Sequence, residues 1–242
     1  MFIPLRDDNP TRRIPYVTFF FITLNVLIFV YQLFSPQGLQ FFVYKMGAIP
    51  YEITHFKSLP LVSMASGESL SRLSPPLTLI VSMFMHGGLF HLIFNMLYLW
   101  IFGNNIEDFL GSVWFVLFYL ICGLGASLTH ILFNPNSQVP MIGASGAIAG
   151  ILGAYLILYP QARVLTLVFL FFFIRIIPIP AAFVLGLWFL IQVLNIGAGG
   201  GVAWFAHIGG FVVGLVAGAV LRASKGRRRS YRDPGQYRYR RW

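Results

Sequence analysis

The sequence has little charge and almost no cysteine. Only 10% of its 242 residues are charged, whereas 57% are hydrophobic. Soluble domains carry about 25% charged residues, so this composition excludes an ordinary soluble domain and indicates a polytopic membrane protein. The single cysteine, Cys122, excludes an internal disulfide. In its apolar surroundings we expect Cys122 to be a small buried hydrophobic side chain.

Acidic residues are scarcer still, with 7 Asp and Glu against 17 Lys and Arg. Nine of these basic residues lie between Arg222 and Trp242. A basic tail can bind nucleic acid, but on a membrane protein it more naturally contacts anionic lipids of the cytoplasmic leaflet. We therefore expect anionic lipids and no nucleic acid as partners. Residues 223–242 lack an apolar face and are expected to form a disordered cytoplasmic tail.

Long apolar runs dominate the rest of the chain. A helix needs about 20 mainly apolar residues to cross a bilayer, and six segments approach this length. They are approximately Pro15–Phe34, Gly88–Gly103, Val113–Phe133, Gly143–Tyr159, Ala181–Ile196 and Val202–Leu221. The predicted fold class is therefore an all-α polytopic membrane protein with six transmembrane helices. Its membrane domain spans residues 15–222, after a cytoplasmic N-terminal segment at 1–14.

Basic residues near the ends of the spans predict the orientation. Arg12 and Arg13 precede the first span, and the basic tail follows the last. Both termini are therefore expected in the cytoplasm. The expected location is the plasma (inner) membrane. The fourth and sixth spans then run in the same direction, so polar residues near their starts lie at one depth.

Two stretches do not fit simple spans. Residues 35–76 form a long outer connection whose middle, Leu39–Ile53, is apolar enough to lie in the membrane interface. The run Val164–Ile174 is too short to cross, and Pro178 and Pro180 end it. It is interpreted as an interfacial segment on the cytoplasmic side, with a short re-entrant hairpin as the alternative.

One serine and one histidine stand in apolar, glycine-rich surroundings. Ser145 opens the fourth span within Gly-Ala-Ser-Gly, and His207 lies early in the sixth. Polar groups at membrane depth are costly and suggest function, and a serine nucleophile needs a base such as histidine. Since the outer ends of the spans offer no acidic partner, a Ser–His dyad is expected. Glycines every fourth residue on both helices predict close packing between them.

A second polar group enters the second span. His91 and Asn95 are four residues apart and share a helix face, where they could donate hydrogen bonds to a developing oxyanion. A purely structural hydrogen-bonding cluster is the alternative. His86 and His91 are five residues apart and diverge on a helix, and no zinc motif is present, so no metal is expected. Glu107 is interpreted as a cap or interhelical hydrogen-bonding group at the cytoplasmic side.

Together these motifs resemble the rhomboid family of intramembrane serine proteases. The matching elements are His86-x4-His91-x3-Asn95, Trp100-Ile-Phe-Gly103 followed by Glu107, Gly143-Ala-Ser-Gly146, and Ala206-His207-x-Gly209-Gly210 followed by Gly214. They occur in the family's order over roughly residues 15–222.

The resemblance implies roles for individual residues. Ser145 would be the nucleophile and His207 the general base, with His91, Asn95 and the Ser145 N–H at the oxyanion. It implies that His86 lies near a water-accessible cavity open to the outside. It also implies lateral substrate entry between the second and fifth helices. The gate would include Phe94 and either Trp188 or Phe189.

Two departures from the family pattern stand out. Leu77 and Thr78 occupy positions where many members carry Trp-Arg, and Ala149 replaces an aromatic residue on which the histidine ring stacks in some members. The sequence leaves open what orients His207. Neither departure removes a reacting group.

The sequence thus predicts a cofactor-free serine endopeptidase that cleaves transmembrane protein substrates near the outer membrane boundary. A non-catalytic relative that binds membrane segments is the alternative. A transporter would place ionisable groups at several depths and often shows internal repeats, and the sequence has neither.

Overall fold

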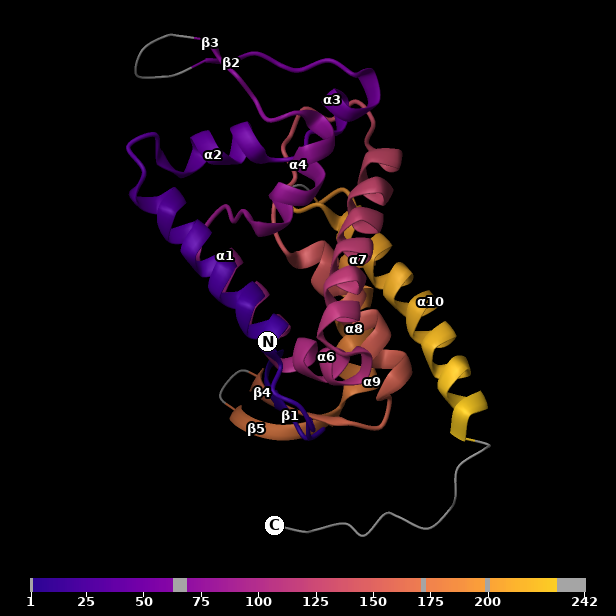
Figure 1. Ribbon diagram of the computed structural model, residues 1–242. Coiled ribbons are helices and arrows are strands. Elements are labelled where there is room, and N and C mark those ends of the chain that lie inside the picture. Colours follow the sequence, from indigo (N-terminus) through magenta and orange to yellow (C-terminus); the bar gives the residue numbers. More distant parts are fainter. Residues whose placement is uncertain (1, 63–68, 171–172, 199–200, 230–242) are drawn as a thin grey trace.

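The computed structural model describes residues 2–62, 69–170, 173–198 and 201–229 (Figure 1). Every apolar segment predicted as a span is helical. These helices are α1 (Tyr16–Phe34), α5 (Leu89–Tyr98) continuing through the π-helical turn η2 (Leu99–Gly103) into α6 (Asn104–Leu110), α7 (Ser112–Phe133), α8 (Ser145–Leu158), α9 (Ala181–Leu194) and α10 (Trp204–Arg229). α8 lies between α7 and α10 in the middle of the bundle.

Among the described residues, four helices are long and apolar enough to cross a membrane. They are Tyr16–Phe34, Leu89–Leu110, Ser112–Phe133 and Trp204–Ser224. α8 and α9 have 14 residues each, which is about 21 Å of helix and shorter than a hydrocarbon core of about 30 Å. The fold is therefore that of a multi-pass helical membrane protein, and the two short helices sit among longer ones.

One end of the bundle, here called the basic end, carries Arg12, Arg13 and Arg222. The start of α1 and the end of α10 both lie there (Figure 1). The opposite end, the loop end, holds the long connection after α1. That connection forms α2 (Gly38–Met46), α3 (Pro50–His55), the short strand pair β2 (Leu61–Val62) and β3 (Ser69–Leu70), α4 (Pro75–Val81) and the 3₁₀ turn η1 (Ser82–Phe84).

A buried ion pair fixes the loop end. Arg72 Nε lies 3.1 Å from Glu52 Oε1, with the side chains 4% and 1% exposed. Glu52 Oε1 also accepts a 2.6 Å hydrogen bond from the Leu59 backbone N–H. The pair ties the segment before α4 to α3. Nothing in the sequence pattern pointed to it, because the two residues are twenty positions apart in an irregular connection.

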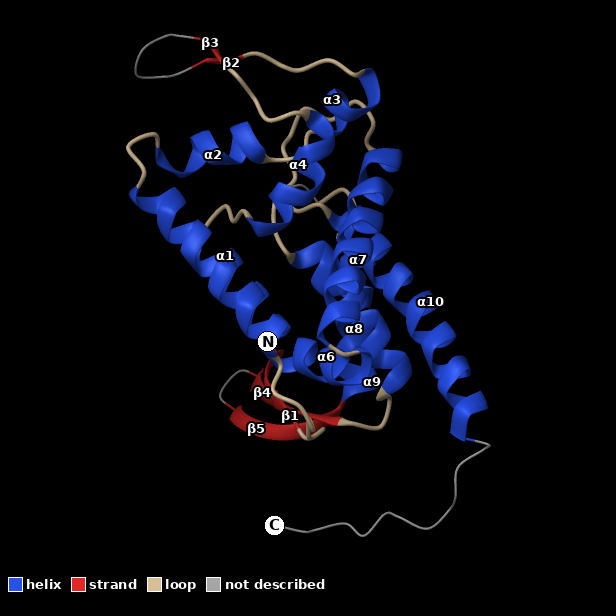
Figure 2. Ribbon diagram, viewed as in Figure 1, coloured by secondary structure: helices blue, strands red, loops and turns tan. Residues whose placement is uncertain are grey.

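The prediction of an all-α fold is wrong at the basic end, where three strands form an antiparallel sheet (Figure 2). β4 (Arg163–Leu170) lies between β1 (Phe2–Asp7) and β5 (Phe173–Pro180). Val164, Thr166 and Val168 on β4 are buried. The interfacial segment expected at 164–174 is therefore the core of a β-hairpin, with residues 171–172 outside the described part. Its β-branched and aromatic residues favour strands, but a run that is apolar except for Thr166 hides the two-residue period.

Asp7 anchors the sheet to the helices. Its Oδ2 accepts hydrogen bonds of 2.6 Å from the Tyr155 hydroxyl on α8 and 2.7 Å from the Asn105 amide on α6. Burial raises the pKa of the Asp7 carboxyl, while the hydrogen bond from Tyr155 opposes that shift. The N-terminal segment is thus an ordered part of the fold, and it contacts the C-terminal half of α8, at the basic end.

Glycines allow α8 and α10 to touch along their backbones, as their spacing predicted. A Cβ at Gly214 would overlap the Gly150 carbonyl oxygen, and one at Gly210 would overlap that of Gly146. On the other flank of α8, a Cβ at Gly150 would overlap the side chain of Cys122 on α7. Cys122 is fully buried there. This contact sets the distance between the helices that carry Ser145 and His207.

We expect Gly214→Ala to destabilise the protein by about 1–3 kcal/mol, because an extra methyl group must push two packed backbones apart. The matched control is Gly186→Ala on α9, where nothing lies within 4 Å of the added Cβ. It should change stability by less than about 0.5 kcal/mol. Thermal unfolding of both variants in the same detergent measures the difference. Equal melting temperatures for the two variants would contradict the proposed helix contact.

The predicted disorder of residues 223–242 is wrong for its first part, since α10 continues to Arg229. Ala, Lys and Arg are good helix formers, and a helix extends easily once started. Residues 230–242 lie outside the described part of the chain.

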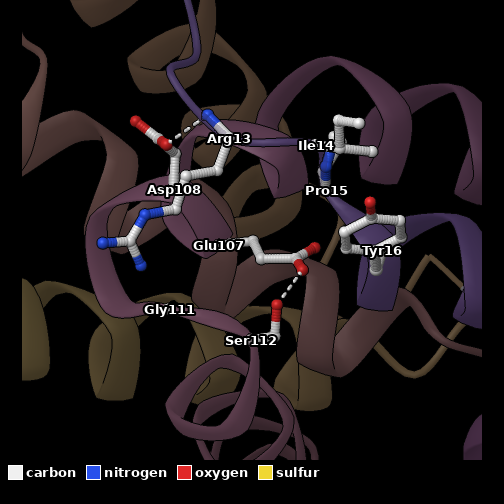
Figure 3. A pocket seen from close by; sticks show the side chains of 8 residues that line it. All are labelled: Arg13, Ile14, Pro15, Tyr16, Glu107, Asp108, Gly111 and Ser112. Carbon is white, nitrogen blue, oxygen red and sulfur yellow. Dashed lines mark hydrogen bonds between the residues drawn. The ribbon is translucent and has the colours of Figure 1, made fainter.

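Glu107 caps α1 at the basic end, as its position beside a helix end indicated, and Figure 3 shows its carboxylate next to Ser112. Its carboxylate accepts hydrogen bonds of 3.0 and 2.8 Å from the backbone N–H groups of Val17 and Thr18. The hydroxyls of Thr18 and Ser112 add bonds of 2.8 and 2.7 Å. The carboxylate therefore satisfies orphan N–H groups of α1 and links this helix to α7. A cavity of about 380 Å³ adjoins it, lined in part by Arg13 and Asp108.

Glu107→Ala should lower the free energy of unfolding by about 2–4 kcal/mol, because the buried donors that share this carboxylate would be left without an acceptor. Asp108→Ala is the control, because that side chain accepts a 3.0 Å hydrogen bond from the exposed Arg13 N–H and caps no buried donor in the described part of the chain. Differential scanning fluorimetry compares the two. A Glu107→Ala protein as stable as Asp108→Ala would exclude the capping role.

Candidate active site

Ser145 is the first residue of α8, and a strained glycine places it there. Gly143 has φ +117°, a conformation that other residues rarely adopt. Its N–H donates to the Ser82 carbonyl, 2.8 Å away, which fastens the turn to η1. The Ser145 N–H therefore belongs to the first turn of a helix, where backbone donors have no partner within the helix and the dipole favours negative charge.

His207 lies in the first turn of α10, at the same depth as Ser145. Its Nε2 is 2.8 Å from Ser145 Oγ. The expectation that the two side chains meet near the start of their helices agrees with this distance. Both residues are half-buried, so the pair is accessible without being on the open surface.

His91 lies on the other side of the serine turn. A Cβ built on Gly143 would be 2.7 Å from His91 Nε2 and 3.7 Å from Ser145 Oγ, so the imidazole edge and the hydroxyl flank one small space. His91 Nδ1 accepts a 3.4 Å bond from the Gly87 N–H. In the neutral ring the proton therefore belongs on Nε2, which faces the serine turn as a donor.

Asn95 lies one turn further along α5 and is 7% exposed. Its Nδ2 donates to the His91 carbonyl at 2.8 Å. An amide nitrogen carries two protons, so this bond leaves one for another acceptor. Asn95, His91 and Ser145 all line one cavity of about 1130 Å³ at the loop side of the bundle.

His86 is placed differently from the expectation. It is fully buried and is absent from the described residues that line the cavity. Gln32 on α1 holds its backbone through reciprocal bonds of 3.2 and 3.3 Å. This places its ring edge-on against His91, with centroids 5.0 Å apart. His86 therefore supports His91 from behind instead of facing water.

The three residues expected at a lateral gate divide into two groups. Phe94 and Trp188 line the cavity, and Phe94 is 40% exposed. Phe189 does not line it among the described residues and stacks on Phe211 of α10, with ring centroids 4.5 Å apart. Adjacent positions on a helix point about 100° apart, so Trp188 and Phe189 cannot both face the cavity.

The sequence analysis missed two neighbours of His207. Gln192 on α9 places Oε1 2.8 Å from His207 Nδ1, and Trp204 sets its ring edge-on to the imidazole at a centroid distance of 6.1 Å. One signal was available for Gln192. It is a lone amide in an apolar helix, and such groups at membrane depth suggest function. His130 on α7 lines the same cavity.

The fold and this site define a class, a multi-pass helical membrane protein with a serine–histidine pair in a cavity at one end of its bundle. The sequence model of the rhomboid domain matches residues 74–224. The chain belongs to the rhomboid family.

Individual relatives agree. The chain is 33% identical over 214 residues to "Rhomboid protease GluP" of Bacillus subtilis, a match that covers 87% of this chain and 36% of that protein. It is 33% identical over 153 residues to "Rhomboid protein 1, mitochondrial" of Saccharomyces cerevisiae, covering 59% and 41%. It is 36% identical over 150 residues to "RHOMBOID-like protein 6, mitochondrial" of Arabidopsis thaliana, covering 59% and 43%. The chain thus spans less than half the length of these curated relatives.

Proposed function

We propose that this chain is an intramembrane serine endopeptidase that cleaves transmembrane proteins near the loop end of its bundle. The observation that carries the proposal is the 2.8 Å contact between Ser145 Oγ and His207 Nε2, within a cavity among apolar helices. Nucleophile and base at hydrogen-bond distance are the mark of an activated serine. One relative carries "protease" in its name, which supports the same activity.

The chemistry follows from the arrangement. Ser145 Oγ attacks the scissile carbonyl carbon while its proton passes to His207 Nε2. The new oxyanion is held by the Ser145 N–H, His91 Nε2–H and the second amide proton of Asn95. His207 then protonates the leaving amine as the C–N bond breaks. Water, deprotonated by His207, hydrolyses the acyl-enzyme and restores Ser145.

Six membrane crossings fit this proposal. Under it the short helices α8 and α9 also cross, and the basic end faces the cytoplasm because its arginines flank the first and last helices. Phe94 and Trp188 then lie where a substrate helix enters from the side. The basic residues that follow Arg222 contact anionic lipids of the inner leaflet. For a bacterial cell, the protein would lie in the plasma membrane.

Purified protein in detergent, incubated with a fluorophore-tagged single-span substrate, tests the activity. Two fragments should form with the wild-type protein and none with Ser145→Ala. Addition of EDTA should leave the rate unchanged, since the proposed chemistry uses no metal. A protein that binds the substrate but never cuts it would be a non-catalytic membrane-segment binder. Loss of activity in EDTA that zinc restores would point instead to a metal at His86 and His91.

A further inference from the structure

Gln192 touches the imidazole nitrogen that faces away from Ser145. It is the one amide of α9, it is 5% exposed, and its Oε1 lies 2.8 Å from His207 Nδ1. The serine hydroxyl forms a hydrogen bond with Nε2 on the opposite edge of the same ring. Ser145, His207 and Gln192 therefore form a continuous hydrogen-bonded chain across α8, α10 and α9.

The backbone of α9 fixes which end of the amide meets His207. Gln192 Nε2 donates to the Trp188 carbonyl, 2.9 Å away on the preceding turn. Turning the amide over would set its oxygen against that carbonyl, where two acceptors face each other without a proton. The amide oxygen is therefore the group presented to His207, and an amide oxygen can only accept. Nδ1 must carry the proton.

We propose that Gln192 is a positioning residue that holds His207 in the one tautomer able to take a proton from Ser145. With the proton on Nδ1, Nε2 of the neutral ring is unprotonated and accepts from the serine hydroxyl. The other neutral tautomer would aim an N–H at Ser145 and could not act as its base. The inference rests on the proposed protease activity and deepens it, because it names what replaces a carboxylate in this site.

Packing from α9 supports the same role. Trp188 lies 5.9 Å from the His207 ring at a tilt of 36°, and Trp204 stands edge-on at 6.1 Å. The ring thus contacts two indoles, while the position that is aromatic in some family members is Ala149. Trp188 and Gln192 both come from α9, so that helix supplies one indole and the proton acceptor.

The orientation of the His207 ring therefore depends on the position of α9. The opposite face of α9 is exposed, with Phe183, Leu190 and Leu194 at 57%, 50% and 73%, and lies where lipid would contact the bundle. A displacement of α9 towards lipid would remove the acceptor from Nδ1. His207 would then lose its tautomer preference, and the hydroxyl of Ser145 would lose its base.

Three variants of the full-length protein test the proposal. Gln192→Leu keeps the size and removes the acceptor. Gln192→Glu keeps an acceptor and adds charge. Asn195→Ala is the matched control, since Asn195, which caps the C-terminal end of α9, makes the same amide-to-carbonyl bond, to Ile191 at 2.7 Å, and touches no proposed catalytic group. Cleavage kinetics, pH profiles and the rate at which a fluorophosphonate labels Ser145 are measured for each.

We expect Gln192→Leu to lower kcat by about 10- to 100-fold, with little change in KM, because the base is misoriented. Labelling of Ser145 should slow by a similar factor. Gln192→Glu should keep most of its activity, and the acid limb of its pH–rate profile should move upward by about 1–3 pH units, since a carboxylate stabilises the imidazolium. Asn195→Ala should match the wild type.

Two results would overturn the proposal while the protease activity stands. One is a Gln192→Leu protein with wild-type kcat. The other is an equal loss of activity and melting temperature in Gln192→Leu and Gln192→Glu with no shift of the pH profile, which would make Gln192 a packing residue. Failure of the proposed function looks different, because the wild-type protein itself would neither cleave nor react at Ser145.

Discussion

Alanine at Ser145 or at His207 should lower the cleavage rate by at least about four orders of magnitude. Each substitution removes one member of a pair joined by a 2.8 Å contact, and neither member works without the other. The double variant should therefore be little worse than either single variant, because residues that act as one unit are strongly non-additive. Initial rates with a tagged transmembrane substrate give all three values.

Both variants should remain folded, because each removes polar atoms from apolar surroundings. His55→Ala is the histidine control, since His55 stacks on Tyr51 in α3 at the loop end. It should cleave at the wild-type rate. Independent effects that multiply in the double variant would show that Ser145 and His207 do not share one step.

Asn95→Ala should lower kcat by about 100-fold and leave KM nearly unchanged, because its donor bond strengthens only when the oxyanion forms. His91 and the Ser145 N–H share the charge, so the loss should fall at the low end for an oxyanion donor. His91→Ala should reduce kcat further when combined with it.

Asn25→Ala is a closely matched control for Asn95→Ala. Asn25 on α1 is buried and donates to the Phe21 carbonyl at 2.7 Å, as Asn95 does to His91. Asn25→Ala removes the same kind of bond far from the cavity and should affect stability without affecting kcat. A change confined to KM in Asn95→Ala would mean that Asn95 binds substrate and does not stabilise the transition state.

Much of this architecture could be predicted from sequence because lipid imposes simple constraints. Apolar runs predicted where every long helix of the bundle begins within a few residues. Positive charges at both termini placed Ser145 and His207 at one depth. Glycines at every fourth position on α8 and α10 predicted the backbone contact that Gly150 and Gly214 make. Each of these features follows from local composition.

Other features depend on contacts that no local pattern records. The strand Phe2–Asp7 pairs with residues more than 150 positions away. The mostly apolar run at β4 masks the alternation of a strand. His86 belongs to the motif with His91, yet its side chain is fully buried, and Gln32 of α1 hydrogen-bonds to its backbone. Gln192 is a lone amide in an apolar helix, but its contact with His207 depends on α9 packing beside α10.

Covalent labelling of the serine tests the central claim most directly. The wild-type protein in detergent is treated with a fluorophosphonate, and its intact mass and digested fragments are measured by mass spectrometry. The account predicts a single adduct, on Ser145, with parallel loss of cleavage, and no adduct on the Ser145→Ala or His207→Ala protein in the same time. An adduct on another residue, or cleavage that persists in the labelled protein, would contradict the assignment of Ser145 as the nucleophile.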